Sequence, residues 1–259
     1  MKKILYLLLP ALFVLASCGE KAAEKPVDGN ARYAFADSSV YEGNWVNGER
    51  QGQGKMTWTN GCSYEGQWKH DLPNGQGKYT WENGNSFEGE FVDSVPCGEG
   101  IYRWKNGAYY EGMYKDGHPN GKGKYLAPDG STKEGTFKDG WLEGEGMAIN
   151  EFSEKYTGTF KKGKPDGEGT MEYPNGDRYT GSWENGKSEG SGTYIYSSGS
   201  RYSGNFHRGK ADGYGTYIWA NGDRYEGNWK NDMRNGYGKL TTVDGEVYEG
   251  SWYNDHFVE

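Results

Sequence analysis

Few side chains in this sequence could do chemistry. Among its 259 residues are four histidines and three cysteines, and neither set shows the close spacing of zinc ligands or the pattern of an EF-hand loop. The histidines are His70, His118, His207 and His256. Gly-x-Gly recurs, but it is never followed by a helical pattern that would complete a phosphate-binding loop. The sequence therefore predicts no metal, no cofactor and no enzymatic activity.

One pattern, by contrast, recurs every 23 residues without an insertion. Its first position is occupied by Tyr41, Tyr64, Phe87, Tyr110, Lys133, Tyr156, Tyr179, Tyr202, Tyr225 and Tyr248. A glycine follows two residues later and an aromatic residue two after that, in all ten copies. Such a strict period predicts one small unit stacked in a row, each unit contacting mainly its neighbours.

Within each repeat two segments alternate with a period of two. Numbered from the leading tyrosine, positions 1 to 5 read Tyr-x-Gly-x-Trp and positions 12 to 18 read Gly-x-Gly-x-Tyr-x-Trp. This alternation predicts two strands whose aromatic residues share one face. The six polar residues between them, such as 115–120, are expected to form a loop. Asn60-Gly61 marks the turn into the next repeat, and side-chain parity requires a three-residue turn with a glycine bulge.

Charge pairs within the repeats indicate how the two strands face each other. Position 2 is Glu where position 15 is Lys, as in Glu42 and Lys55, and both become Thr together, as in Thr180 and Thr193. Such residues are expected to lie opposite one another across the hairpin. This register places Gly43 against Gly54. It also predicts that Trp45 faces Gly52.

The N-terminus carries the features of an export signal. Lys2 and Lys3 precede an apolar run that is too short to span a membrane, and the run ends in Leu15-Ala16-Ser17-Cys18. This tetrapeptide resembles the lipobox of bacterial lipoproteins, which implies a lipid on Cys18 and cleavage before it. Gly19 in place of Asp favours the outer membrane. The alternative is an ordinary secretory signal with a coincidental cysteine.

Charge and the remaining cysteines narrow the possibilities further. Loss of Lys2 and Lys3 changes the formal charge from −8 to −10, which disfavours nucleic acid, and no basic stripe is expected to compensate. Cys62 falls in the short turn and Cys97 in the long loop, at opposite edges of the predicted sheet. A disulfide needs Cα atoms within about 7 Å. Two free thiols are therefore predicted.

Taken together, the repeat consensus resembles the MORN repeat (membrane occupation and recognition nexus) from Tyr33 to Trp252. The resemblance implies an all-β fold, an elongated single-sheet solenoid of stacked antiparallel β-hairpins. It also implies a non-catalytic scaffold or binding platform. The expected organisation is a signal peptide at 1–17, a lipidated cysteine and flexible tether at 18–30, and an array of about nine full repeats with partial capping repeats at 31–259.

The middle of the array departs from this consensus. Lys133 occupies position 1, three framework aromatics are replaced by Ala127, Ala148 and Asn150, and the turn glycine is lost at Ser153. One interpretation is local drift that leaves a softer joint. The other is a bend that presents Trp141 and Leu142, an unusual apolar pair in the predicted long loop, to a partner.

An arginine recurs before three successive repeats, as Arg178, Arg201 and Arg224. Neighbouring repeats stack about 9.6 Å apart, so the three guanidinium groups are expected to form a row that could hold a polyanion. Local salt bridges with Asp177 and Asp223 are the alternative. The sequence as a whole predicts a membrane-anchored envelope lipoprotein that binds another envelope protein, or alternatively a glycan or peptidoglycan.

Overall fold

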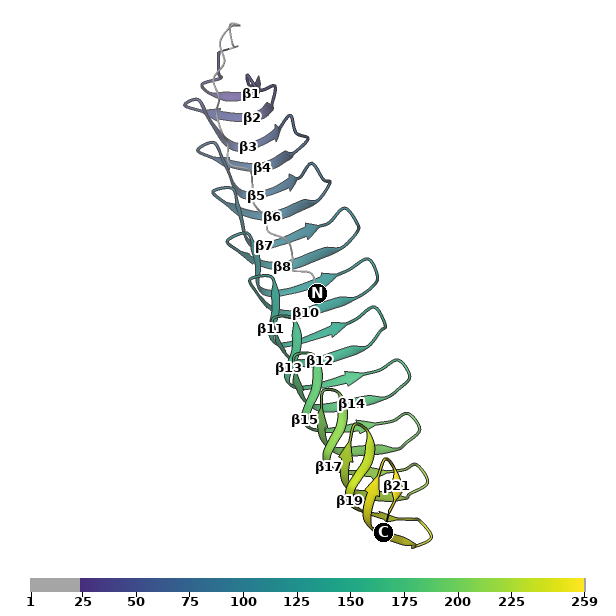
Figure 1. The fold of residues 1–259 in the computed structure, drawn as a ribbon. Coiled ribbons are helices and arrows are strands. Elements are labelled where there is room, and N and C mark those ends of the chain that lie inside the picture. The colour runs from purple at the N-terminus through teal and green to yellow at the C-terminus, as the bar shows by residue number, and fades with distance from the viewer. Residues whose placement is uncertain (1–23, 259) are drawn as a thin grey trace. The chain divides into compact units, whose positions relative to one another are not determined.

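The computed structural model describes residues 24–258, and every regular element within them is a β-strand. Figure 1 shows these strands following one another as hairpins from β1 to β21. The even-numbered strands carry the last position of one repeat and positions 1 to 6 of the next: β2 (Val40–Val46), β4 (Ser63–Lys69), β6 (Ser86–Val92), β8 (Tyr109–Lys115), β10 (Thr132–Lys138), β12 (Lys155–Lys161), β14 (Arg178–Glu184), β16 (Arg201–His207), β18 (Arg224–Lys230) and β20 (Val247–Tyr253).

The odd-numbered strands carry positions 9 to 17. They are β1 (Gly29–Ala34), β3 (Glu49–Thr57), β5 (Leu72–Thr80), β7 (Val95–Arg103), β9 (His118–Leu126), β11 (Trp141–Ile149), β13 (Lys164–Glu172), β15 (Lys187–Ile195), β17 (Lys210–Ile218), β19 (Met233–Thr241) and the short β21 (His256–Phe257). All belong to one antiparallel sheet of 21 strands, which confirms the predicted fold class. The first strand begins at Gly29, and Val27 already accepts a hydrogen bond from the Gly48 amide.

The chain divides into two compact units. The N-terminal unit runs to Pro128 and includes Thr136–Trp141, and the C-terminal unit comprises Asp129–Gly135 and the chain from Leu142 onwards. Within each unit, a strand pairs with the strands before and after it in the chain, as β2 does with β1 and β3.

The predicted six-residue loop is wrong, because the turn between positions 6 and 9 has only two residues. In the first repeat these are Asn47 and Gly48, with φ of 53° and 76°. Two successive residues at positive φ are typical of a type I′ hairpin turn, which asparagine, aspartate and glycine tolerate best. Residues expected in the loop, such as His118, therefore belong to a strand.

The other turn has the predicted three residues. Trp58 donates its amide to the Cys62 carbonyl, and Gly61 donates to the Trp58 carbonyl with φ of 83°. The Asn60 side chain accepts the Cys62 amide at 3.0 Å. This geometry is the glycine-bulge turn that side-chain parity required.

The opposition of Gly43 and Gly54 is confirmed, but Trp45 does not face Gly52. Beyond the glycine pair a bulge shifts the register, so that Trp45 lies opposite Arg50. Gly52, with φ of 66°, instead lies opposite Trp68 of the next repeat. A Cβ atom on Gly52 would meet the Asn44 side chain at 3.1 Å, so this glycine makes no room for a ring.

Each buried leading tyrosine ring lies against two glycines of its own hairpin. A Cβ atom on Gly54 would come within 2.1 Å of the Tyr41 hydroxyl, and one on Gly43 within 2.7 Å. The hydroxyl of Tyr64 continues past the equivalent glycines to donate to the Gln67 carbonyl at 2.9 Å. Glycine is required at these positions because backbone and ring approach too closely for any side chain.

The rings at positions 1 and 5 form an edge-to-face zipper within each unit. Tyr41 contacts Trp45 of its own repeat at 5.0 Å between centroids and Trp68 of the next repeat at 5.3 Å. Tyr179 repeats this arrangement with Trp183 and Phe206 at 5.1 and 4.9 Å. Such pairs contribute about 0.5–1.5 kcal/mol each beyond their burial. The zipper buries one side of every hairpin against its neighbour.

Lys133 removes one ring from this pattern, and Leu142 fills the space. A Cβ atom on Gly135 or Gly146 would meet the Leu142 methyl groups, where a tyrosine ring lies in the other repeats. Leu142 is 1% exposed. Burial also lowers the pKa of the Lys133 ammonium group. The fifth repeat thus keeps a packed interior with different side chains.

Candidate binding surfaces

The aromatic face is occupied by packing and offers no reactive group. Tyr41, Tyr64, Tyr110 and Tyr225 have no measurable exposure. Burial raises the pKa of Tyr41 to about 12, although the nearby Arg50 charge opposes the rise. These phenols stay neutral at physiological pH. The rings at position 18, such as Trp58 and Trp81, are partly exposed on this face, and the opposite face of the sheet and its edges offer further surface for binding.

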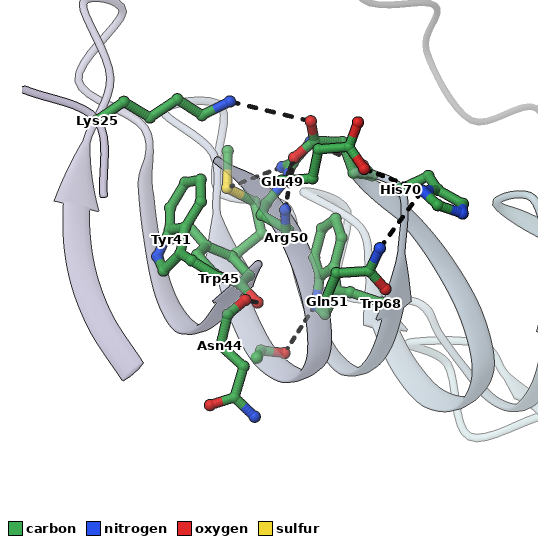
Figure 2. A network of polar contacts seen from close by, with 12 residues as sticks. Lys25, Tyr41, Asn44, Trp45, Glu49, Arg50, Gln51, Trp68 and His70 are labelled. Atoms are coloured by element: carbon green, nitrogen blue, oxygen red, sulfur yellow. Dashed lines mark hydrogen bonds and ion pairs between the residues drawn. The ribbon is translucent and has the colours of Figure 1, made fainter. Parts of the chain in front are cut away.

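A partly buried arginine, Arg50, joins the first two repeats on this packed side (Figure 2). The Arg50 guanidinium lies 4.5 Å from the Trp68 ring centroid, and its Nε and Nη2 donate to the side chain and the carbonyl of Asp71 at 2.9 and 2.7 Å. Burial alone would raise the pKa of Asp71, but hydrogen bonds and charge from Arg50 hold it below its usual value. This contact serves repeat packing.

The same contact recurs in the last full repeat. Arg234 lies 4.3 Å from the Trp252 ring centroid and donates to the side chain and the carbonyl of Asp255 at 3.1 and 2.8 Å. The intervening repeats have Pro, Leu, Ser or Ala at the arginine position. A cation stacked on an aromatic ring thus reinforces an early and a late junction.

The outer face of the N-terminal unit carries a self-paired charge ladder. Glu42 lies opposite Lys55, as predicted, and Lys55 forms its ion pair with Glu65 of the next repeat at 3.1 Å. Lys78 and Glu88 repeat this pairing at 3.8 Å. These side chains are more than half exposed, so each pair contributes little stability. The ladder leaves few unpaired charges for a ligand.

The outer face of the C-terminal unit is different. The corresponding row is mostly neutral, with hydroxyl pairs such as Thr170–Thr180 and Thr193–Ser203, each at 3.0 Å. In an adjacent row, the registers place Arg178, Ile195, Arg201, Ile218 and Arg224 side by side on successive strands. The three predicted arginines therefore lie on one face, two strands apart and exposed.

Their local partners differ from those expected. Arg224 forms an ion pair with Glu226 at 2.5 Å rather than with Asp223. Asp177 accepts hydrogen bonds from the Tyr194 hydroxyl and the Ser197 amide, both at 2.8 Å. Arg178 and Arg201 form no ion pair with any residue of 24–258. Binding of a polyanion by these arginines remains a prediction.

Exposed aromatic residues on this face were missed by the sequence reasoning. Tyr214 and Tyr237 are 54% and 61% exposed, and Ile195 is 42% exposed. Both tyrosines occupy position 13, where the N-terminal unit has glutamine at residues 53 and 76. The signal was available, because side-chain parity places position 13 on the face opposite the packed rings.

Trp141 and Leu142 do not form an exposed pair. Both lie at the beginning of β11, and alternation along the strand directs them to opposite faces. Leu142 is buried over two glycines, so the prediction that it is presented to a partner is wrong. Trp141 is partly exposed, and its contact with a partner remains a prediction.

The structure also reveals a basic edge, contrary to the expectation that no basic stripe exists. Residues beside the two-residue turns of the C-terminal unit include five exposed lysines, here called the turn-edge lysines: Lys161, Lys164, Lys187, Lys210 and Lys230. Lys162 and Arg208 lie within the turns themselves. Sequence reasoning missed the cluster because each repeat contributes only one to three of these charges.

The structure also places the two cysteines that lie within residues 24–258. Cys62 and Cys97 are free thiols, as predicted, and Cys97 lies in β7 rather than in a loop. Within residues 24–258, no cluster of His, Cys, Asp and Glu could hold a metal ion, and no helix could span a bilayer. Cys18 lies outside the described residues, so its lipidation remains a prediction.

Solved structures similar to this one share little sequence with it. The TCP10 domain of Danio rerio CPAP, in complex with a STIL peptide, is 15% identical over 85% of this chain and 97% of that one, with a TM-score of 0.39. The SAS-4 TCP domain of Drosophila melanogaster is 17% identical over 60% and 85%, with a TM-score of 0.38. Scores this low establish no shared function.

No protein with a curated description matches the chain. The family model of the MORN repeat, however, matches nine segments: 41–63, 64–86, 87–109, 110–132, 134–148, 156–178, 179–201, 202–224 and 225–247. These segments cover most of the chain and coincide with the hairpins described above. The chain therefore belongs to the MORN-repeat family.

Proposed function

We propose that this protein is a non-catalytic lipoprotein, anchored through Cys18 to the bacterial outer membrane, whose repeats form a binding platform for another envelope protein. MORN repeats are commonly protein- or membrane-binding modules, and the chain is built almost entirely of them. The lipobox-like Leu15-Ala16-Ser17-Cys18 supports the anchor.

The observation that carries the proposal is the outer face of the C-terminal unit, which combines exposed Tyr214, Tyr237 and Ile195 with the arginine row. Tyrosine and arginine are enriched at the centres of protein interfaces, whereas Lys and Glu are depleted. The outer face of the N-terminal unit pairs Lys55 and Lys78 with glutamates and also carries Arg103 against Tyr109. Among its described residues, however, no tyrosine is as exposed as Tyr214 or Tyr237. A protein partner is therefore assigned to strands β14 to β19.

Affinity purification of crosslinked complexes from cells tests this assignment. A Tyr214→Ser, Tyr237→Ser protein should lose its partner by about tenfold or more, because interface tyrosines are frequent hot spots. The matched control is Gln53→Ser, Gln76→Ser, which alters the same repeat position in the N-terminal unit. Equal partner recovery by all three proteins would refute the proposal.

A second candidate function is glycan binding, which the arginine row favours. Arg178, Arg201 and Arg224 recur at every second strand, which suits a polymer with regularly spaced anionic groups. Sedimentation with peptidoglycan or lipopolysaccharide tests it. A triple Arg→Ala protein that sediments as well as the native protein would remove this candidate.

A further inference from the structure

The turn-edge lysines are unusual in a chain with a formal charge of −8. Four successive two-residue turns, from Lys161 to Met233, contribute seven Lys or Arg residues and two acids, Glu184 and Asp232. The equivalent turns of the first four repeats, from Val46 to His118, carry only Lys69 and Lys115 against four acids. The basic edge is therefore a property of the C-terminal unit alone.

The neighbouring acids are engaged with the backbone. Glu143 accepts the Lys162 amide at 2.9 Å, Asp166 the Asn185 amide at 3.2 Å, and Asp212 the Asn231 amide at 3.4 Å. Glu189 accepts the Arg208 amide at 2.9 Å, and it also contacts His207 at 2.8 Å. These acids hold each turn against the preceding repeat and reduce the positive potential without removing it.

The ammonium groups of the turn-edge lysines, by contrast, are not paired with these acids. None of the five turn-edge lysines forms an ion pair within the part of the chain that the structure describes. Lys161, Lys162 and Lys164 line a depression of about 580 Å³ that reaches Trp183 in the next repeat. Asp166 and Glu184 also line it, so the lysines exceed the acids by one. Free ammonium groups around a hollow, and further lysines continuing along the same edge, provide a starting point and a track for an anionic chain.

We propose that the turn-edge lysines bind a linear acidic polysaccharide. Successive turns lie about 9.6 Å apart, so most repeats offer one or two positive charges over that length. Double-stranded DNA carries one charge per roughly 1.7 Å, a density this edge could not neutralise against the acidic remainder of the protein. A sugar chain with one carboxylate per residue or per disaccharide has a linear charge density much closer to that of the edge.

This surface is separate from the outer-face tyrosines and arginines, so it goes beyond the proposed function. Lys164 and Lys210 begin their strands beside two-residue turns. Arg178 begins β14 beside a three-residue turn at the opposite edge of the sheet, and Tyr214 lies in the middle of β17. A protein partner and a polysaccharide could thus be held by different parts of the same unit. Failure of one assignment leaves the other standing.

Binding of the full mature protein to polygalacturonic acid, a linear polymer of carboxylated sugars, tests the inference. The test variant is Lys161→Gln, Lys164→Gln, Lys187→Gln, Lys210→Gln. The matched control, Lys55→Gln, Lys69→Gln, Lys78→Gln, Lys115→Gln, makes the same change in net charge in the N-terminal unit. All eight lysines are exposed, so both variants are expected to fold, as circular dichroism would verify.

The native protein should bind the polymer, with an affinity that falls as salt rises, and should not bind dextran. The turn-edge variant should lose about tenfold or more in affinity and the control less than about twofold, because only the first removes contacting charges. Equal losses in both variants, or no binding by the native protein, would overturn the inference. Tighter binding to oligo-dT or to phosphatidylglycerol vesicles would also overturn it, since the edge would then serve another polymer or a membrane.

Discussion

The two units of this protein have the same packing pattern in their interiors and different residues on their outer faces. In both, a tyrosine ring covers two glycines and meets an aromatic ring of the next repeat edge to face. On the outer face, the first repeats of the N-terminal unit pair their lysines with glutamates, whereas the C-terminal unit exposes a row of arginine and isoleucine and two tyrosines, Tyr214 and Tyr237. The comparison teaches that the packed residues specify the fold and leave the exposed positions free to acquire different binding properties.

The largest effect on stability is expected at Leu142, where the C-terminal unit packs its interior without a tyrosine. Leu142→Ala should lower the free energy of unfolding by about 3 kcal/mol, because it leaves a cavity over Gly135 and Gly146. Trp141→Ala should cost less than about 1 kcal/mol, since that side chain is partly exposed. Chemical denaturation measures both values. Similar costs for the two changes would contradict the placement of Leu142.

Because the packing pattern is the same in both units, a Gly→Ala change under a tyrosine ring should lower stability equally in each. A Cβ atom at Gly77 would lie 2.3 Å from the Tyr64 hydroxyl, and one at Gly192 would lie 2.4 Å from the Tyr179 hydroxyl. Each Gly→Ala change should therefore cost about 2–3 kcal/mol in thermal unfolding. The neighbouring exposed positions, Gln76→Ala and Ser191→Ala, are the controls. An alanine that leaves stability unchanged at either glycine would contradict the same packing in both units.

The arginine–aspartate contacts should matter less, at about 1 kcal/mol each, because solvent reaches both carboxylates. Asp71→Asn and Asp255→Asn are the test variants. The folded-state pKa of Asp71 is lowered, so its contribution is present above the unfolded pKa of about 4 and is lost as pH falls below that value. Unfolding measured between about pH 6 and pH 3 should show the native protein losing its advantage over Asp71→Asn. An advantage that persists undiminished at pH 3 would contradict this role.

The smallest effect is expected on the outer face itself. Lys78→Gln in the charge ladder and Thr193→Ala in the hydroxyl row should each change stability by less than about 0.5 kcal/mol. Salt should reduce the first effect and leave the second unchanged. A salt-insensitive loss above about 1 kcal/mol at Lys78 would mean that the ladder supports the fold rather than only covering it.

Much of the fold could be predicted because side chains alternate strictly along strands. The strands and the glycine-bulge turn at Asn60-Gly61 follow from that alternation, and the Glu42–Lys55 opposition follows from residues that change together between repeats. The length of the other turn could not be predicted, because asparagine, histidine and lysine all occupy its first position at positive φ. Only the bulge after Gly43, which the sequence does not mark, explains how Trp45 comes to face Arg50.

The binding surfaces were harder to predict than the fold. The arginine row follows from spacing, since Arg178, Arg201 and Arg224 share one repeat position. The burial of Leu142 could not be predicted from its own position in the repeat. Leu142 fills the space of a tyrosine ring that is absent because residue 133, nine residues earlier, is a lysine. The turn-edge lysines were overlooked because adjacent hairpins, rather than adjacent residues, bring Lys164, Lys187 and Lys210 into one row.

Site-specific photo-crosslinking in intact cells tests whether the outer face of the C-terminal unit binds a protein. A benzophenone amino acid would replace either Tyr214 on the outer face of the C-terminal unit or Gln53 at the same repeat position of the N-terminal unit. A discrete crosslinked protein is expected from position 214 and none from position 53. The same products from both positions, or no protein product from position 214, would contradict it.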